Sequence, residues 1–148
     1  MGDRTYMHLH MLKIHYINNF ELIDNNFGVS CDSIGYCTKR HIFDWDKHKI
    51  EDSNDKWVGL NIDEINYGGR AELKMLMEHR FPFYGMHGAG GSYMSYVFAY
   101  AGGSEPLREI VCDMDGNPMV RIDHSDYAND DMRDLINYRI AMNKIKEL

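Results

Sequence analysis

The stretch that decides the fold is Phe81–Gly103, which reads FPFYGMHGAGGSYMSYVFAYAGG. Two aromatic-rich runs, 81–87 and 93–100, flank a glycine-rich segment at 88–92. Aromatic residues suit the pleated, half-buried surface of a strand, and glycine turns tightly because it reaches positive φ without a Cβ clash. The stretch therefore predicts a β-hairpin, with Pro82 at the start of its first strand because proline cannot donate to a sheet ladder.

The second strand of this hairpin is expected to have one bulky face and one small face. Alternate residues of a strand share a face, so Tyr96, Phe98 and Tyr100 lie together with Met94. We expect this bulky face to cover a hydrophobic core.

Two further regions have strand patterns. Residues 5–16 alternate as a strand, with an apolar face on one side and His8 and His10 on the other. Residues 105–123 are expected to form a second hairpin, because Asp115-Gly116 is a strong signal for a two-residue turn.

Apolar residues at helical spacing predict three helices. The first covers 20–27 and is stopped by Gly28, the second covers 70–80, and the third is capped by Asn129. The expected buried stripe of the third helix consists of Met132, Leu135, Ile136 and Ile140. The predicted fold is α+β: an antiparallel sheet of about four to five strands, with two to three helices packed mainly on one face.

Length and composition limit the class of protein. The 148 residues suit one globular domain, 1–148, and the 44% hydrophobic residues argue against disorder. The three cysteines form no paired pattern, so a reducing cytoplasm is the expected location. Neither a signal peptide nor a membrane span is predicted, because the apolar runs are too short. The net charge of −7 makes direct binding to nucleic acid unfavourable.

Two glycine-rich segments are candidate ligand loops. Gly-Gly before a helix can present backbone N–H groups to an anion, and 87–91, His-Gly-Ala-Gly-Gly, lets a partner approach the backbone closely. The His-Gly-x-Gly order also resembles the oxyanion-hole stretch of some esterases, but the chain has no Gly-x-Ser-x-Gly nucleophile turn. The candidate binding residues of these segments are Tyr67, Gly68, Gly69, Tyr84, His87, Gly88, Gly90, Gly91 and Tyr93.

Acidic residues suggest a different kind of site. They could steer a basic protein partner, although charge runs usually just face water. The candidates are Asp44, Asp52, Asp55, Asp63 and Glu64.

Catalytic and metal chemistry have weaker signals. His8 and His10 share a strand face and are candidate metal ligands, but the third ligand would have to come from elsewhere in the fold. No catalytic residue, metal or cofactor is predicted, and the protein is more readily a binding protein than an enzyme.

Three functions are therefore open. The leading hypothesis is a small acidic, tyrosine-rich binding protein: a phage- or mobile-element-encoded inhibitor that covers the surface of a host defence protein, as anti-CRISPR proteins do. One alternative is a small-ligand or nucleotide-binding protein that uses the glycine-rich loops. The other is a small hydrolase or metal enzyme that uses His8, His10 and His87. Self-association as a homodimer is compatible with each.

Overall fold

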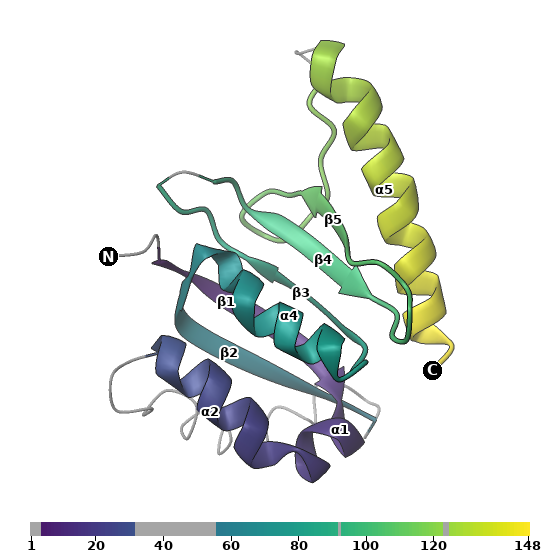
Figure 1. Ribbon diagram of the computed structural model, residues 1–148. Coiled ribbons are helices and arrows are strands. Elements are labelled where there is room, and N and C mark those ends of the chain that lie inside the picture. Colours follow the sequence, from purple (N-terminus) through teal and green to yellow (C-terminus); the bar gives the residue numbers. More distant parts are fainter. Residues whose placement is uncertain (1–3, 32–55, 92, 123–124) are drawn as a thin grey trace.

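The protein is built around a five-stranded antiparallel sheet with strand order β2-β1-β3-β4-β5. The computed structural model describes residues 4–31, 56–91, 93–122 and 125–148 (Figure 1). The strands are β1 (Arg4–Leu12), β2 (Trp57–Asn66), β3 (Phe83–His87), β4 (Tyr96–Tyr100) and β5 (Arg108–Val111). The α+β prediction is confirmed.

Helices cover both faces of this sheet, but unequally (Figure 1). Side chains of α1 (Lys13–Asn18), α2 (Phe20–Cys31) and α4 (Arg70–Glu78) join the core on one face. The long α5 (Ser125–Lys146) packs against β4 and β5 from the other side. Within the described ranges, no helix has both the length and the apolar character needed to cross a membrane.

The main core lies between the sheet and the first group of helices. Leu9 of β1 and Phe98 of β4 are fully buried there, together with Ile23 of α2 and Leu76 of α4. The bulky face that the sequence predicts for the second hairpin strand is therefore half right: Phe98 and Tyr100 enter the core, whereas Met94 lies before β4 and is exposed.

The first strand is shorter than predicted. It ends at Leu12, and the chain then turns into α1, so the prediction of a strand through Tyr16 is wrong. The backbone N–H of Lys13 donates to the carbonyl oxygen of Lys56 at 2.8 Å, and Tyr16 re-enters the core from the helix. The next helix also differs from its prediction, because α2 continues past Gly28 to Cys31.

Strand β2 is absent from the sequence prediction. It pairs along the whole of β1, and its buried residues Leu60, Ile62 and Ile65 do not keep a strict alternation. The pairing register shifts between Thr5 and Met7, which accounts for the three-residue step from Ile62 to Ile65. A bulge of this kind disturbs the period-two pattern by which strands are recognised in a sequence.

The central hairpin is confirmed, and the second hairpin only in part. Strand β3 pairs with β4 in register, and Pro82 precedes β3 as expected. Strand β5 and the turn after it form, with the Asp113 carboxylate accepting the backbone N–H of Asp115 and Asn117, each at 2.9 Å. Up to residue 122, where the described segment ends, the predicted return strand does not form: its pairing is limited to an isolated bridge between Cys112 and Pro118.

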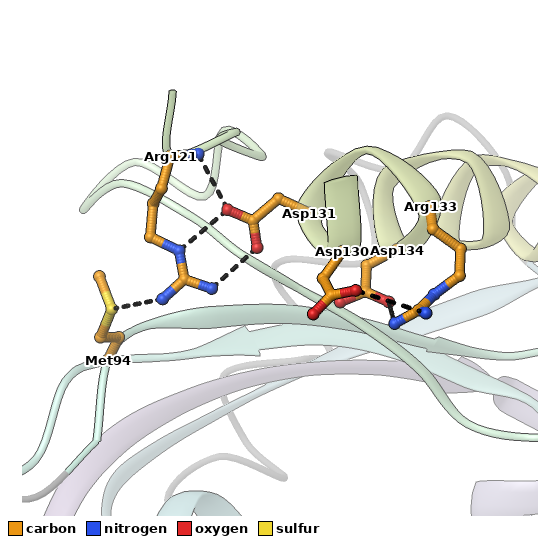
Figure 2. A network of polar contacts seen from close by, with 6 residues as sticks. All are labelled: Met94, Arg121, Asp130, Asp131, Arg133 and Asp134. Atoms are coloured by element: carbon orange, nitrogen blue, oxygen red, sulfur yellow. Dashed lines mark hydrogen bonds and ion pairs between the residues drawn. The ribbon is translucent and has the colours of Figure 1, made fainter. Parts of the chain in front are cut away.

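The segment after that turn is instead held by α5. The side chain of Arg121 donates to Asp131 at 2.8 and 2.9 Å, and its backbone N–H donates to the same carboxylate at 2.8 Å. Figure 2 shows this pair beside a second, exposed cluster in which Arg133 contacts Asp130 and Asp134. Arg121 also lies over the ring of Tyr127. These contacts anchor the segment to the helix.

The buried face of α5 agrees with the predicted stripe only at Leu135, which packs against the sheet. The inner face contains Asp131, Ala141 and Ile145, whereas Met132, Ile136 and Ile140 are about half exposed. The helix also begins at Ser125, ahead of the predicted cap Asn129. Because the buried Asp131 carries an ion pair, the apolar pattern alone selected the wrong face.

Cys112 lies where α5 meets the sheet. Its side chain is buried in a cluster with Val97 and Val111, against which Leu135 and Tyr138 pack. Burial, with a smaller contribution from the charge of Asp113, raises the pKa of the Cys112 thiol to about 11.

Candidate functional site

His87 is the centre of the candidate site. It is the last residue of β3, it pairs with Met7 on one side and Tyr96 on the other, and its side chain is only 4% exposed. Its Nδ1 lies 2.8 Å from the carbonyl oxygen of Gly88. A carbonyl oxygen can only accept, so Nδ1 carries the proton, and the Nε2 of the neutral ring is a hydrogen-bond acceptor.

Burial keeps this imidazole neutral. Desolvation lowers the pKa of His87, and it outweighs the opposing effects of the Gly88 hydrogen bond and the Glu109 charge. A buried neutral histidine of this tautomer presents one fixed acceptor rather than a positive charge.

The turn η1 (Tyr67–Gly69) lies against Nε2 of His87. All three residues of the turn have positive φ, which is unusual for Tyr67. A Cβ on Gly68 would stand 2.9 Å from Nε2 of His87, and one on Gly69 would stand 2.4 Å from the methyl group of Met7. The sequence needs glycine at both positions because the chain turns left-handed while touching the sheet.

The second glycine segment joins the same site through Tyr93. The hydroxyl of Tyr93 accepts the backbone N–H of Gly68 at 3.2 Å, and its ring stands edge-on to His87 with centroids 5.5 Å apart. Gly90 lies so close to this ring that an added Cβ would be 2.3 Å from it. The two glycine segments, about twenty residues apart in sequence, therefore converge on one histidine.

Two adjoining cavities open beside His87, and both have Arg70 and His87 in their walls. The first, of about 200 Å³, is otherwise lined by Tyr67, Tyr93 and Tyr96. The second, of about 190 Å³, has apolar and charged walls made by Gly68, Leu73, Lys74, Met77, Leu107 and Glu109. We refer to the two together as the His87 pocket.

The rim of the pocket carries both signs of charge. The guanidinium of Arg70, at the start of α4, donates to both carboxylate oxygens of Glu109 on β5 at 3.2 Å. Lys74, one turn further along α4, adds a second cation. The three groups sum to a single positive charge, which favours an anionic ligand.

Several predicted binding residues meet here. Tyr67, Gly68, His87 and Tyr93 line the pocket, and Gly69, Gly88 and Gly90 shape its turns. Gly91 is exposed in the loop beside them. The oxyanion-hole comparison fails at two points, because the N–H groups of Gly88 and Gly90 already donate to the carbonyl oxygens of Tyr6 and Tyr93.

Other candidates lie elsewhere. Tyr84 points to the opposite face of the sheet, where its ring stacks on His10 with centroids 4.6 Å apart. His8 and His10 are on that face too, away from His87, so the three do not converge. Across the described ranges, no three histidine, cysteine or acidic side chains are grouped as metal ligands.

The acidic candidates do not form a site in the described residues. Asp44, Asp52 and Asp55 lie outside them, and the side chain of Asp63 is not described. Glu64 is exposed and pairs with Arg4 at 2.8 Å.

Sequence reasoning missed the charged and apolar half of the pocket. Arg70 follows Gly68-Gly69 directly and could have been found from that position. Glu109, Lys74 and Leu107 carry no local signal, since they reach the pocket only through the packing of α4 beside β5. No protein-family model, curated protein or solved structure matches the chain.

Proposed function

We propose that the protein binds a small anionic ligand with a planar ring, of which a nucleotide is the chief candidate, in the His87 pocket. The observation that carries this proposal is the convergence of the two glycine turns on the buried, neutral His87. Strained and close-packed backbone of this kind is costly, and it is found most often at functional sites. Tyr67, Gly68 and Gly69 all adopt positive φ at this point.

Three features of the pocket indicate the ligand's chemistry. One cavity is lined by three tyrosines, and aromatic side chains are the usual partners on which a planar heterocycle stacks. His87 is in the wall of both cavities and, being neutral, adds no charge there, so the charge preference of the pocket comes from its rim. Arg70 and Lys74 supply two cations against the single carboxylate of Glu109, which suits a phosphate or carboxylate group.

The size of the pocket supports a ligand with two parts. The cavities measure about 200 and 190 Å³, and ligand pockets are usually about 300 Å³ or larger. A ligand is therefore expected to occupy both, with its ring among the tyrosines and its acidic group near Arg70 and Lys74.

Calorimetric titration of the purified protein would test this proposal. The panel contains the four nucleoside monophosphates, their nucleosides, an aromatic carboxylic acid and inorganic phosphate. We expect a monophosphate to bind more tightly than its nucleoside, and Lys74→Gln to weaken binding. The matched control is Lys146→Gln, an exposed lysine at the end of α5, which should bind as the parent does.

The remaining outcomes are decisive as well. Binding of the aromatic acid alone would support the His87 pocket as a ligand site and would contradict a nucleotide as its ligand. A fragment screen by NMR in which no compound shifts the signals of His87 or Tyr93 would overturn the proposal as a whole.

The inhibitor hypothesis stays a prediction. It relies on an acidic surface that meets a basic protein, and three of its five acidic residues lie outside the described ranges. Charge reversal with Asp52→Lys and Asp55→Lys remains its test: a partner captured equally well by the reversed protein would contradict it.

A further inference from the structure

Helix α5 presents an apolar row to solvent. Met132, Ile136 and Ile140 are 47%, 54% and 50% exposed and follow each other at intervals of four residues, so they lie along one ridge. The ridge is opposite the inner face, where Ala141 and Ile145 are buried against the sheet. We call these three residues the outer stripe. Grouped apolar side chains on a surface often mark a contact with another protein.

The outer stripe is symmetrical about its middle residue. Met132 and Ile140 each lie four residues from Ile136, and Asn129 and Asn143 each lie seven residues from it. If two copies of α5 cross with a two-fold axis at Ile136 and run antiparallel, Met132 of one copy meets Ile140 of the other. Such an interface is self-complementary, as a two-fold homodimer requires.

The charges of α5 favour the same arrangement. Aspartates dominate the first half of the helix, and three of its four basic residues lie in the second half: Arg139, Lys144 and Lys146. An antiparallel pair brings Asp130 of one copy near Lys144 of the other, and it also opposes the helix dipoles. A parallel pair would bring like charges together.

The ion pairs that Asp130 and Lys144 make within one copy do not prevent a new pair between copies. Asp130 contacts Arg133 at 3.5 Å and Lys144 contacts Glu105 at 2.7 Å, and all four side chains are well exposed. Exposed ion pairs contribute little to stability, about 0–1 kcal/mol, so they can rearrange when a second copy arrives.

We propose that the protein forms a two-fold homodimer through the outer stripe of α5, with the two helices antiparallel and Ile136 at the axis. The proposal is independent of any ligand in the His87 pocket, which lies on the other face of the sheet.

The first test is the molar mass in solution, measured by light scattering over a dilution series. We expect the mass to rise from that of a monomer to that of a dimer with concentration. Ile136→Glu should raise the dissociation constant about tenfold or more, because it places a charge at the centre of the apolar contact. The matched control is Ile17→Glu, an equally exposed isoleucine on α1, which should not change the mass.

The second test fixes the orientation by cross-linking of introduced cysteines, in a protein whose Cys31 and Cys37 are replaced by serine and whose Cys112 is buried. Ile136→Cys should link to itself. Asn143→Cys should link to Asn129→Cys in a mixture, but not to itself. Self-linking of Asn143→Cys would overturn the antiparallel arrangement, and a monomer at every concentration, or a dimer indifferent to Ile136→Glu, would overturn the dimer.

Discussion

The His87 pocket and the outer stripe of α5 are built in opposite ways. The pocket draws on η1, α4, the end of β3, Tyr93, the start of β4 and β5, and its central side chain is nearly inaccessible. The outer stripe comes from a single helix and uses side chains that the fold itself leaves half exposed. The pocket is therefore tied to the stability of the fold, whereas the stripe can be altered without disturbing it.

The largest effect is expected at Gly68. Gly68→Ala places a Cβ at positive φ and 2.9 Å from His87, and we expect a loss of about 2–4 kcal/mol of unfolding free energy, with loss of ligand binding. Chemical denaturation measures the loss. Gly103→Ala is the control, because Gly103 has a similar φ but open space around it, and about 1 kcal/mol is expected there. Equal losses at both sites would show that contact with His87 does not matter.

The second-largest loss of stability is expected at Asp131, on the inner face of α5. Asp131→Ala removes the carboxylate that accepts three hydrogen bonds from Arg121, and we expect a loss of about 1–3 kcal/mol. The hydrogen bonds of Arg121 lower the pKa of Asp131 in the folded state. Its stabilisation is therefore complete above the unfolded value, about 3.9, and is lost as the pH falls through the lower folded value.

Denaturation of both proteins at several pH values checks this. The difference between parent and Asp131→Ala should be constant near neutral pH and shrink below about pH 4. A difference that persists in strong acid would mean that the carboxylate contributes by packing and not by charge.

A smaller effect is expected from the titration of His87. Because the folded pKa is lowered, the unfolded chain binds a proton first as the pH falls below about 6.5, and acidification favours unfolding until the folded pKa is passed. Burial also lowers the pKa of His15, so the comparison with His87→Asn is needed to isolate His87. Between pH 7 and 5 the parent should lose more stability than His87→Asn; parallel curves would contradict a neutral, buried His87.

The smallest effect is expected on the outer stripe. Met132→Gln should change the unfolding free energy of the monomer by no more than about 0.5 kcal/mol, because the side chain is already half exposed. Thermal denaturation at high dilution, where a dimer would be dissociated, is the measurement. A larger loss would show that the stripe belongs to the fold and would remove the contrast with the pocket.

The sequence predicts the parts of the fold whose pattern is local. The 81–100 hairpin and the α4 helix follow from aromatic runs, glycine-rich turns and helical spacing. The candidates Gly68, His87 and Tyr93 lie together in the structure, and their role in binding stays a prediction. Strand β2 is not predicted from the sequence, because a bulge breaks its alternation and its acidic residues suggest a loop.

Two errors have a tertiary cause. On α5 the apolar pattern marks Met132, Ile136 and Ile140 as buried, but the buried Asp131 and its ion pair with Arg121 turn the helix the other way. In the pocket, Glu109 comes from an edge strand whose place beside α4 depends on the order of all five strands. Neither the orientation of α5 nor the position of Glu109 can be predicted from a short segment of sequence.

The buried Cys112 makes it possible to measure how often α5 separates locally from the sheet. A thiol-directed reagent attacks the thiolate, and a pKa of about 11 together with burial leaves almost none of it accessible in the closed state. In a protein without Cys31 and Cys37, the rate at which Cys112 is labelled would report the frequency with which the contact between α5 and the sheet opens. A native side chain thus reports local opening of this part of the fold, without a cysteine having to be introduced.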